Sequence, residues 1–453
     1  MEIRDPVHGF ICVPEDELKI VNTPVFQRLR RIRQLAMAHL VYPGATHTRF
    51  EHSLGSFHVA TKMAGNLLRG KENERRRRIV RFAALLHDLG QGPFSHVSDD
   101  VFELMEDSGL PASARAHEFI TTKILDCDPD LQRIIGEDTV KDVISLIQRR
   151  EIHPSVMHEI ISGAFDVDKM DYLLRDSLFC GVKYGVFDLD RMLSTLTTCP
   201  GKIGVDCHLA VHEKGVNSLE QFVLARYFMT TQVYKHKIRS ITDAMIARGI
   251  ELGIDEGIDF LAKIYHYEDS PEYILNYLKW DDARLADAIA RDRRKGSCSE
   301  MFTRLEERNL FKRVFRSEIG ALEIGGPMQI RVKNISLASE RELRKEFEAT
   351  VSRLSPLGCR PEHVIAKCLT FGSAKETVSG AEGELLVLRT AREPDQFSKA
   401  SAVFRSINET NRDQFLEVYA PLDFEGREKE KAEQKIEHAI IQLLLEMEKN
   451  YGD

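Results

Sequence analysis

The sequence predicts a mainly α-helical protein with a smaller α+β portion at its C-terminal end. Two observations support this fold class. Apolar residues recur at helical spacing through most of residues 20–300, and beyond residue 310 the pattern changes to short apolar runs that favour strands. We therefore expect two domains, a helical body of residues 1–310 and an α+β portion of residues 311–453.

The helical body begins with a short apolar repeat. Val25, Leu29 and Ile32 lie at helical spacing, and Thr23 before Pro24 is predicted to cap the helix that they form. Glycine and proline at residues 42–46 and 90–93 predict loops. Further helices are predicted at residues 53–69, 75–88, 116–126, 139–149, 157–177, 217–248 and 257–265.

The C-terminal portion contains both kinds of element. Short runs of apolar and β-branched residues predict strands at residues 329–332, 384–388 and 415–419. Residues 340–354 and 395–409 are predicted to be helices between these strands. The last segment, residues 426–449, has the pattern of a charged amphipathic helix.

Composition narrows the classes of function. The formal net charge of −8 argues against a surface built throughout for nucleic acid. Basic runs at residues 28–33 and 75–78 are either solvated helix faces or local phosphate-binding surfaces. The eight cysteines include no CxxC pair, so neither a disulfide framework nor a cysteine zinc site is expected. With no targeting segment and no apolar run near the roughly 20 residues that span a bilayer, a cytoplasmic protein is expected.

Two histidines and two aspartates stand out as candidate metal ligands. They are His52, the adjacent pair His87 and Asp88, and Asp168. A His-Asp dipeptide by itself occurs often by chance, but two imidazoles with two carboxylates form a mixed site suited to Mn, Fe, Zn or Co. Neighbours on a helix diverge by about 100°, yet the glycine-rich turn after His87 and Asp88 would let both face one ion. Asp168 also begins a row, because it lies on one helical face with Tyr172 and Asp176.

The order His52, His87-Asp88, Asp168 resembles the signature of the HD phosphohydrolases. Longer stretches at residues 5–9, 26–30, 48–55, 92–96 and 166–172 resemble the deoxynucleoside triphosphate (dNTP) triphosphohydrolases of this superfamily. That group is related to the human sterile-alpha-motif-and-HD-domain protein. The similarity begins at residue 1, so the sterile-alpha-motif domain is expected to be absent. The resemblance implies hydrolysis of a dNTP to a deoxynucleoside and inorganic triphosphate.

The resemblance also implies roles for the candidate residues. The four metal ligands would be His52, His87, Asp88 and Asp168. His96 would protonate the leaving oxygen or handle the proton of the attacking water, since an imidazole can serve either way near neutral pH. The residues implied to support that centre are His117, Glu118 and the orienting carboxylate Asp99.

A second implied set would bind the nucleotide. Cationic side chains would clamp the triphosphate, and Mg²⁺ would accompany it. Asp176 would accept a hydrogen bond from the 3′-hydroxyl, and Tyr234 would crowd the 2′ position and so favour deoxyribose. The clamp consists of Arg49, Lys169 and Arg226, and the sugar contacts are Tyr172, Asp176, Tyr234, Gln34 and Leu35.

Three departures from the family pattern bear on function. Gln91 stands where the family usually has histidine, and glutamine can donate and accept hydrogen bonds but cannot exchange a proton near pH 7. Thr230 and Lys235 replace a histidine and a glutamine near the sugar. In the implied activator-nucleotide site, Asn22 replaces an aspartate while Gln27 and Arg30 match, so the identity of an activator stays open. The resemblance also implies a homotetramer with nucleotide sites at the subunit contacts.

Two other functions remain open at this point. The same metal centre serves HD-type phosphodiesterases, so a phosphodiesterase or nuclease acting on nucleic acid or a signalling nucleotide is an alternative. Gln91 suggests a third, a nucleotide-sensing assembly protein with weak catalysis. Product analysis distinguishes the three functions. A triphosphohydrolase releases triphosphate, a phosphodiesterase or nuclease releases nucleoside monophosphates, and a nucleotide sensor binds nucleotide without turnover.

Overall fold

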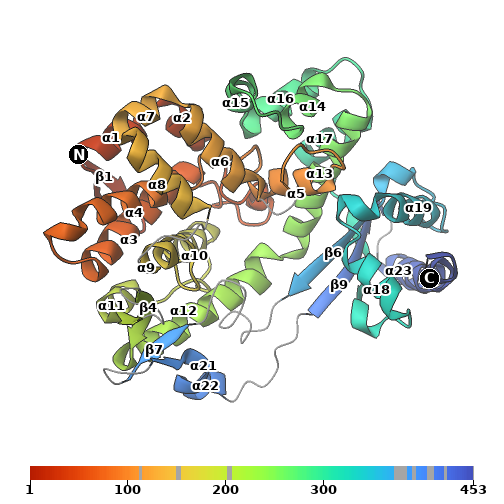
Figure 1. Cartoon of the computed structure of the whole chain (residues 1–453). Helices are drawn as coiled ribbons and strands as arrows, with labels where there is room; N and C mark the ends of the chain where they lie inside the picture. The colour runs from red at the N-terminus through yellow and green to blue at the C-terminus, as the bar shows by residue number, and fades with distance from the viewer. Residues whose placement is uncertain are drawn as a thin grey trace. The chain divides into compact units, whose positions relative to one another are not determined.

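A computed structural model gives the fold (Figure 1), and it describes residues 1–111, 115–148, 155–200, 207–371, 385–389, 394–405, 413–422 and 426–451. Helices dominate, with small sheets added, which confirms the predicted fold class. The chain forms two compact units, each assembled from three segments. Unit 1 comprises Met1–Ser95, Ser113–Tyr234 and Gly372–Asn411, and unit 2 comprises His96–Ala112, Lys235–Phe371 and Arg412–Asp453. The domain boundary expected at residue 310 stays a prediction.

Unit 1 begins with an antiparallel hairpin, β1 (Glu2–Asp5) and β2 (Gly9–Cys12), in which Glu2 pairs with Cys12. Its helices include α3 (Arg49–Leu67), α4 (Glu74–Leu86), α9 (Val156–Ser162) and α10 (Val167–Cys180), which pack together. Further helices of unit 1 are α1 (Glu15–Val21), α2 (Pro24–Gln27), α6 (Ala116–Cys127), α7 (Pro129–Ile135), α8 (Glu137–Ile147), α11 (Leu189–Thr195) and α12 (Val216–Phe228).

A four-stranded sheet completes unit 1. Strands β3 (Leu196–Pro200) and β4 (Cys207–His212) form an antiparallel pair, and β4 then pairs in parallel with β7 (Leu386–Leu388). The edge strand β8 (Pro394–Gln396) leads into the short helices α21 (Phe397–Ala400) and α22 (Ala402–Arg405). The strand and helix predicted at 384–388 and 395–409 thus have counterparts here, although residues 384 and 406–409 lie outside the described residues.

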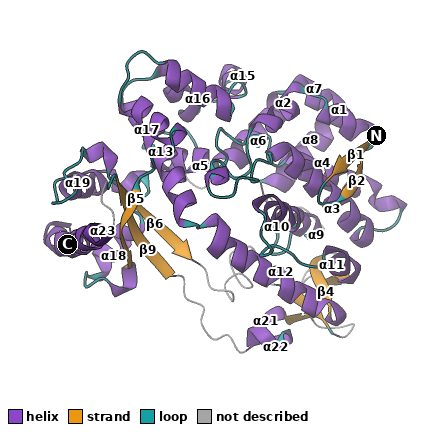
Figure 2. Ribbon diagram, turned by 180° about the vertical axis from the view of Figure 1, so that it is seen from behind, coloured by secondary structure: helices purple, strands orange, loops and turns teal. Residues whose placement is uncertain are grey.

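Unit 2 contains a three-stranded antiparallel sheet with β9 (Asp413–Ala420) between β5 (Lys312–Glu318) and β6 (Ile365–Phe371). Figure 2 shows α18 (Gly326–Lys333), α19 (Arg341–Ser352) and α23 (Gly426–Tyr451) beside this sheet. Their buried residues, among them Phe347, Val418 and Ile440, form one apolar core. The other helices are α5 (His96–Leu104), α13 (Lys237–Asp255), α14 (Asp259–Tyr265), α15 (Pro271–Tyr277), α16 (Asp282–Arg291) and α17 (Ser297–Glu306).

Four predicted elements are wrong in detail. The helix expected to contain Val25, Leu29 and Ile32 is the short α2 followed by a 3-10 helix, Arg28–Arg31, and Ile32 is already extended. The strand expected at 329–332 is part of α18, because Met328 and Val332 are buried one helical turn apart while Ile330 between them is 60% exposed. The helix expected at 157–177 is two helices, since Asp166 caps a new one by accepting a hydrogen bond from the Lys169 amide. The helix expected at 217–248 is interrupted by a π-helix, Met229–Tyr234, before α13 begins.

The membrane prediction concerns helix length and apolarity. Of the helices in the described part of the chain, none combines the length and the apolar character that crossing a bilayer requires.

Candidate metal centre

Three helices of unit 1 bring the predicted metal ligands together. Thr48 and Glu51 form a capping box at the start of α3, which places His52 in the first turns of that helix. His87 follows the last residue of α4 and caps its C-terminal end. Asp168 lies in the first turn of α10, two residues after the cap at Asp166.

The loop that carries Asp88 is held against α6. The Gly90 amide donates to Thr121 Oγ1 at 2.8 Å, and the same hydroxyl donates to the His87 carbonyl at 3.0 Å. A side chain at residue 90 would overlap the backbone of His117 and Thr121. Glycine is therefore required where this loop meets α6.

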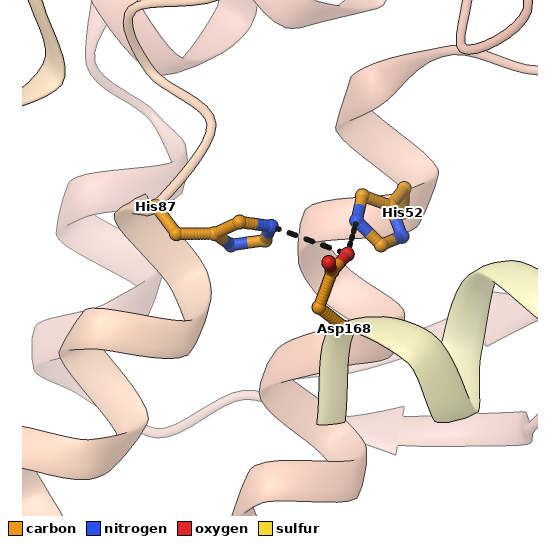
Figure 3. A group of neighbouring side chains, drawn as sticks. All are labelled: His52, His87 and Asp168. Atoms are coloured by element: carbon orange, nitrogen blue, oxygen red, sulfur yellow. Dashed lines mark ion pairs between the residues drawn. The ribbon is translucent and has the colours of Figure 1, made fainter. Parts of the chain in front are cut away.

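The ligand atoms converge on a small volume, as Figure 3 shows for His52, His87 and Asp168. Asp168 Oδ1 lies 2.9 Å from His52 Nε2 and 3.6 Å from His87 Nε2. Asp88 Oδ2 lies 3.7 Å from His52 Nε2, and Asp88 Oδ1 lies 3.6 Å from His87 Nε2. His52, His87 and Asp168 could hold one ion, and Asp88 lies beside both histidines.

The hydrogen bonding of the two histidines fits a metal. His52 Nδ1 lies 2.8 Å from an oxygen of Asp171, and His87 Nδ1 lies 2.9 Å from the Ala84 carbonyl oxygen. Within the described residues, both Nε2 atoms are buried, and although Asp168 lies near them, neither atom forms a well-directed hydrogen bond. Buried polar atoms in this state call for a partner, and a divalent cation among two imidazoles and two carboxylates is one that matches the donor set.

The electrostatics of the cluster favour positive charge at the same place. Burial would lower the pKa of His52, but Asp168 and Asp171 raise it to about 10. Burial likewise opposes ionisation of Asp88, yet Arg49 and the neighbouring histidines hold the pKa of that carboxyl well below its usual range. The same carboxylates would attract a divalent cation.

Two further predicted residues border this cluster. Arg49 Nη1 donates to Asp88 at 2.8 Å and Arg49 Nε donates to Ser95 Oγ at 2.9 Å. Gln91 is fully buried, and its side-chain nitrogen lies 3.4 Å from Asp88 Oδ1. In the described part of the chain, Arg49 Nη2 and Gln91 Oε1 have no hydrogen-bond partner. Both atoms could contact a ligand.

Several of the predicted sugar contacts lie around Asp176, at the C-terminal end of the row that Asp168, Tyr172 and Asp176 form on α10. The Tyr234 hydroxyl donates to Asp176 at 2.7 Å, and His47 Nε2 lies 2.7 Å from the other oxygen of that carboxylate. The rings of Tyr172 and Tyr234 meet edge to face with centroids 6.0 Å apart. Burial raises the pKa of the Tyr172 hydroxyl, while Arg226 acts in the opposite direction.

The remaining nucleotide-binding candidates are buried or already bonded. The Gln34 backbone N–H donates to the His47 carbonyl at 3.0 Å, and the Gln34 and Leu35 side chains are both buried. Lys169 Nζ donates to Asp166 at 2.7 Å and to the Gly163 carbonyl at 3.1 Å. To bind a phosphate, Lys169 would have to share or exchange these contacts.

The predicted proton-handling residues are divided between the units. His117 and Glu118 lie in the first turn of α6 in unit 1, where His117 helps to lower the pKa of Asp88 and Glu118 pairs with Arg115 at 3.2 Å. His96 and Asp99 lie on α5 and are grouped with unit 2, where their side chains are 3.2 Å apart.

The three candidate activator residues lie near one another in unit 1. Asn22 is exposed at the end of α1. The Gln27 side chain donates to the Val21 carbonyl at 2.7 Å and accepts from Arg30 Nε at 2.9 Å. Arg30 also lies over the Phe50 ring, 3.5 Å from its centroid.

The sequence predicted no role for His47, Asp171 or His8, which contact the predicted residues or support them. Asp171 was quoted within the 166–172 stretch but received no role. Its position three residues after Asp168 was an available signal, because that spacing puts both on nearby parts of one helix face. His8 lies in the 5–9 stretch and His47 lies close to His52 in the sequence, but neither has a spacing that specifies its contact.

Comparison with known proteins assigns the family. A model described as "HD domain" matches residues 49–176, and a model described as "HD associated region" matches residues 187–442. The chain belongs to the HD-domain phosphohydrolase family. The predicted resemblance is thereby confirmed, and an HD domain implies a divalent metal.

Several relatives of this HD-domain chain are known. An uncharacterized Bacillus subtilis protein, YwfO, is 30% identical over 69% of this chain and 71% of its own length. Human deoxynucleoside triphosphate triphosphohydrolase SAMHD1 is 30% identical over 69% of this chain and 54% of its own length. An uncharacterized Methanocaldococcus jannaschii protein, MJ1154, is 37% identical over 56% of the chain, and the match spans half of that protein.

Solved structures show the same fold. A phosphohydrolase from Bacteroides thetaiotaomicron superposes with a TM-score of 0.71 at 25% identity, covering 93% of this chain and 99% of its own. A hypothetical protein from Aquifex aeolicus superposes with a TM-score of 0.68 at 27% identity, covering 96% and 100%.

Proposed function

We propose that this phosphohydrolase cleaves dNTPs to deoxynucleosides and inorganic triphosphate, with Mn, Fe, Zn or Co in the HD centre and Mg²⁺ accompanying the triphosphate. One observation carries the proposal. In the described part of unit 1, buried polar atoms that lack hydrogen bonds gather around the metal centre and the sugar end of α10. They belong to His52, His87, Arg49, Gln91, Gln34 and His47. Similar atoms occur elsewhere in the described chain, such as Arg344 Nε, but this group adjoins the candidate ligands and suits a ligand that is both charged and polar.

The reaction needs a metal-binding group at one end of the site. His52, His87, Asp88 and Asp168 would hold the cation, which when bound supplies Lewis-acid polarisation of a phosphate oxygen and of water. Arg49 can donate its remaining N–H groups to a phosphate while it keeps Asp88 in place. Lys169 and Arg226 would complete the cationic clamp.

Helix α10 spaces the two ends of the site. Asp168 and Asp176 are eight residues apart, which corresponds to about 12 Å along a helix axis. Tyr172 lies between them on the same face. An extended nucleotide along this face could have its phosphates near Asp168 and its sugar near Asp176, where Tyr234 would exclude a 2′-hydroxyl.

Proton transfer would fall to imidazoles and not to residue 91. His96, with Asp99 as orienting carboxylate, and His117, with Glu118, are the proposed proton-handling pairs. Gln91 contacts Asp88, so it can position a water or phosphate by hydrogen bonding without exchanging a proton.

Regulation by nucleotide is part of the proposal. An activating nucleotide would bind at Asn22, Gln27 and Arg30, and the active form would be a homotetramer. Nucleic acid is a weaker candidate, because the basic run at 75–78 is bonded to neighbouring side chains. Arg75 pairs with Asp142 at 2.6 Å, and Arg78 pairs with Asp16 at 2.9 Å.

The decisive test is product analysis. Purified protein would be incubated with each dNTP and NTP in Mn²⁺, Mg²⁺, Co²⁺ and Fe²⁺, and the products separated by chromatography. We expect triphosphate and deoxynucleoside, lost together with bound metal in His87→Ala and Asp168→Ala. Exposed Glu15→Ala is the control. Nucleoside monophosphate would indicate the phosphodiesterase alternative, and binding without turnover in every metal would indicate a nucleotide sensor.

A further inference from the structure

The two histidines of the metal centre are oriented by different means. His87 caps α4, where the last carbonyls have no partner in the helix, and its Nδ1 bonds to one of them, at Ala84. His52 lies within α3, where the nearby carbonyls already serve the helix. Its Nδ1 therefore needs an acceptor from another element, and Asp171 on α10 supplies one at 2.8 Å.

Asp171 is itself held rigidly. Arg175 donates to it twice, from Nε at 2.8 Å and from Nη2 at 2.9 Å, and His8 Nε2 lies 2.7 Å from Oδ1. The Asp171 and Arg175 side chains are fully buried. A Cβ at Gly55 of α3 would overlap both of them, so glycine at that position lets the carboxylate approach His52.

The N-terminal hairpin reaches Asp171 by two routes. His8, in the turn between β1 and β2, contacts it directly. Asp5, the last residue of β1, accepts from Arg175 Nη1 at 2.9 Å, and its other oxygen accepts the amides of Val7 and His8, each at 2.9 Å. The turn thus contacts Asp171 directly through His8 and contacts Arg175 through Asp5.

The buried charges around Asp171 also favour a cation near His52. Asp5 and Asp171 share the single guanidinium of Arg175, and all three groups are buried. Asp171 also contacts the imidazoles of His8 and His52, and a second buried carboxylate is offset either by a protonated ring or by a cation close by. Such a cation could lie beyond His52, whose Nε2 faces Asp168 and Asp88.

We propose that Asp171 is the positioning residue for the metal ligand His52, and that Arg175 and the Asp5–His8 turn of the N-terminal hairpin hold it in that role. This inference rests on the metal centre of the proposed function. It makes the hairpin a determinant of metal affinity, although the hairpin supplies no ligand itself. Carboxylates that orient metal-bound histidines typically change metal affinity about 10- to 100-fold when they are replaced.

The test is Co²⁺ titration of the metal-free full chain, followed by the visible absorption of the bound ion, with folding checked by circular dichroism. We expect Asp171→Asn to raise the dissociation constant about 10- to 100-fold and to shift the Co²⁺ spectrum. Asp5→Asn and His8→Gln should raise it less, in the same direction. Glu17→Gln is the matched control, because it removes a buried carboxylate that contacts none of the proposed ligands. Glu17 instead binds Arg81, with 2.8 Å between Oε1 and Nε. This substitution should lower stability and leave Co²⁺ affinity unchanged.

The outcomes separate this inference from the function beneath it. Full Co²⁺ affinity in His52→Ala would remove the metal centre itself. Loss of Co²⁺ in His52→Ala with full affinity in Asp171→Asn would leave the centre standing and refute the positioning role. Should Asp171→Asn not fold, Asp5→Asn and His8→Gln decide, and wild-type dissociation constants in both would overturn the proposal. An equal loss of Co²⁺ affinity in Glu17→Gln would mean that the effect of Asp171→Asn comes from lower stability, which would also overturn the proposal.

Discussion

At the scale of single residues, the carboxylate of Asp176 is held from both sides. His47 lies 2.7 Å from one oxygen and the Tyr234 hydroxyl donates to the other at 2.7 Å. His47 is itself buried and stacked on Phe179 with ring centroids 4.6 Å apart. Asp176 therefore presents its remaining acceptor positions in a fixed direction, as a residue that reads a sugar hydroxyl would need to do.

Tyr234 allows its two proposed roles to be separated. Tyr234→Phe keeps the ring but removes the hydrogen bond to Asp176, and hydrogen bonds to charged groups contribute about 1.5–3 kcal/mol. Because His47 still holds the carboxylate, we expect kcat/KM for dNTPs to fall about tenfold with the preference for deoxyribose retained. Tyr234→Ala should also lose that preference. The ratio of kcat/KM values for dATP and ATP measures it, and an unchanged ratio in Tyr234→Ala would exclude the ring as the selective element.

Gln91 is a second residue where a substitution is informative. It is fully buried and contacts Asp88, so Gln91→His would place an imidazole beside the proposed scissile phosphate. We expect kcat to rise or the pH–rate profile to gain or shift a limb between about pH 6 and 8, where imidazole titrates. Metal content should not change. Gln91→Met is the control that removes the amide without adding a titrating group. If the histidine variant is folded, metal-loaded and kinetically silent, the position plays no part in catalysis.

The sequence supplied candidate residues for the site but not the contacts that support them. His52, His87, Asp88 and Asp168 were proposed because the family signature specifies their identity and order. Asp171 and His8 contact each other across 163 positions of sequence. No periodicity within one segment specifies such a pair, because the packing of α3, α10 and the hairpin brings it together.

At the scale of elements, the end of α4 determines where two ligands lie. The loop after His87 is fixed to α6 through Gly90 and Thr121. The helix start predicted at Thr23 and Pro24 agrees with α2, because the cap residue is visible in the sequence, but α2 ends at Gln27, before Leu29 and Ile32. The break at residues 163–166 was missed, because Asp166 was assigned to the interior of an acidic helix and caps a helix instead.

Gly90→Ala tests the coupling between this loop and the metal centre. The added methyl group would overlap the His117 carbonyl and the Thr121 amide, neither of which is a flexible side chain. We expect a loss of stability of about 1–3 kcal/mol and weaker metal binding, because the loop that carries Asp88 must move. Gly65→Ala on α3 is the control, since a Cβ there meets nothing within 4 Å. That change should stabilise the helix by about 0.5–1 kcal/mol. Thermal unfolding and metal content measure both effects, and wild-type behaviour of Gly90→Ala would contradict the overlap.

At the scale of the whole molecule, the two compact units do not follow the order of the sequence, whereas the predicted domains were two continuous stretches divided at residue 310. Residues 96–112 group with residues 235–371 and 412–453 in unit 2, while residues 372–411 return to unit 1. Helical spacing identifies which face of a segment is buried but not which distant segment covers it. All four proposed metal ligands and the supporting hairpin belong to unit 1.

This division predicts where a metal ion would stabilise the protein. A ligand that binds only the folded state stabilises it by about 2.7 kcal/mol at 100 times its dissociation constant. Among the described residues, the four proposed ligands all lie in unit 1, on α3, α10 and the segment after α4. We therefore expect Mn²⁺, compared with a chelator, to slow amide hydrogen exchange in peptides of these elements and of β1–β2. Peptides of α19, α23 and β9 in unit 2 should change little. His52→Ala should abolish the difference. Equal protection of both units in the wild type would mean that the chain opens as one cooperative body, and protection confined to unit 2 would place the metal elsewhere.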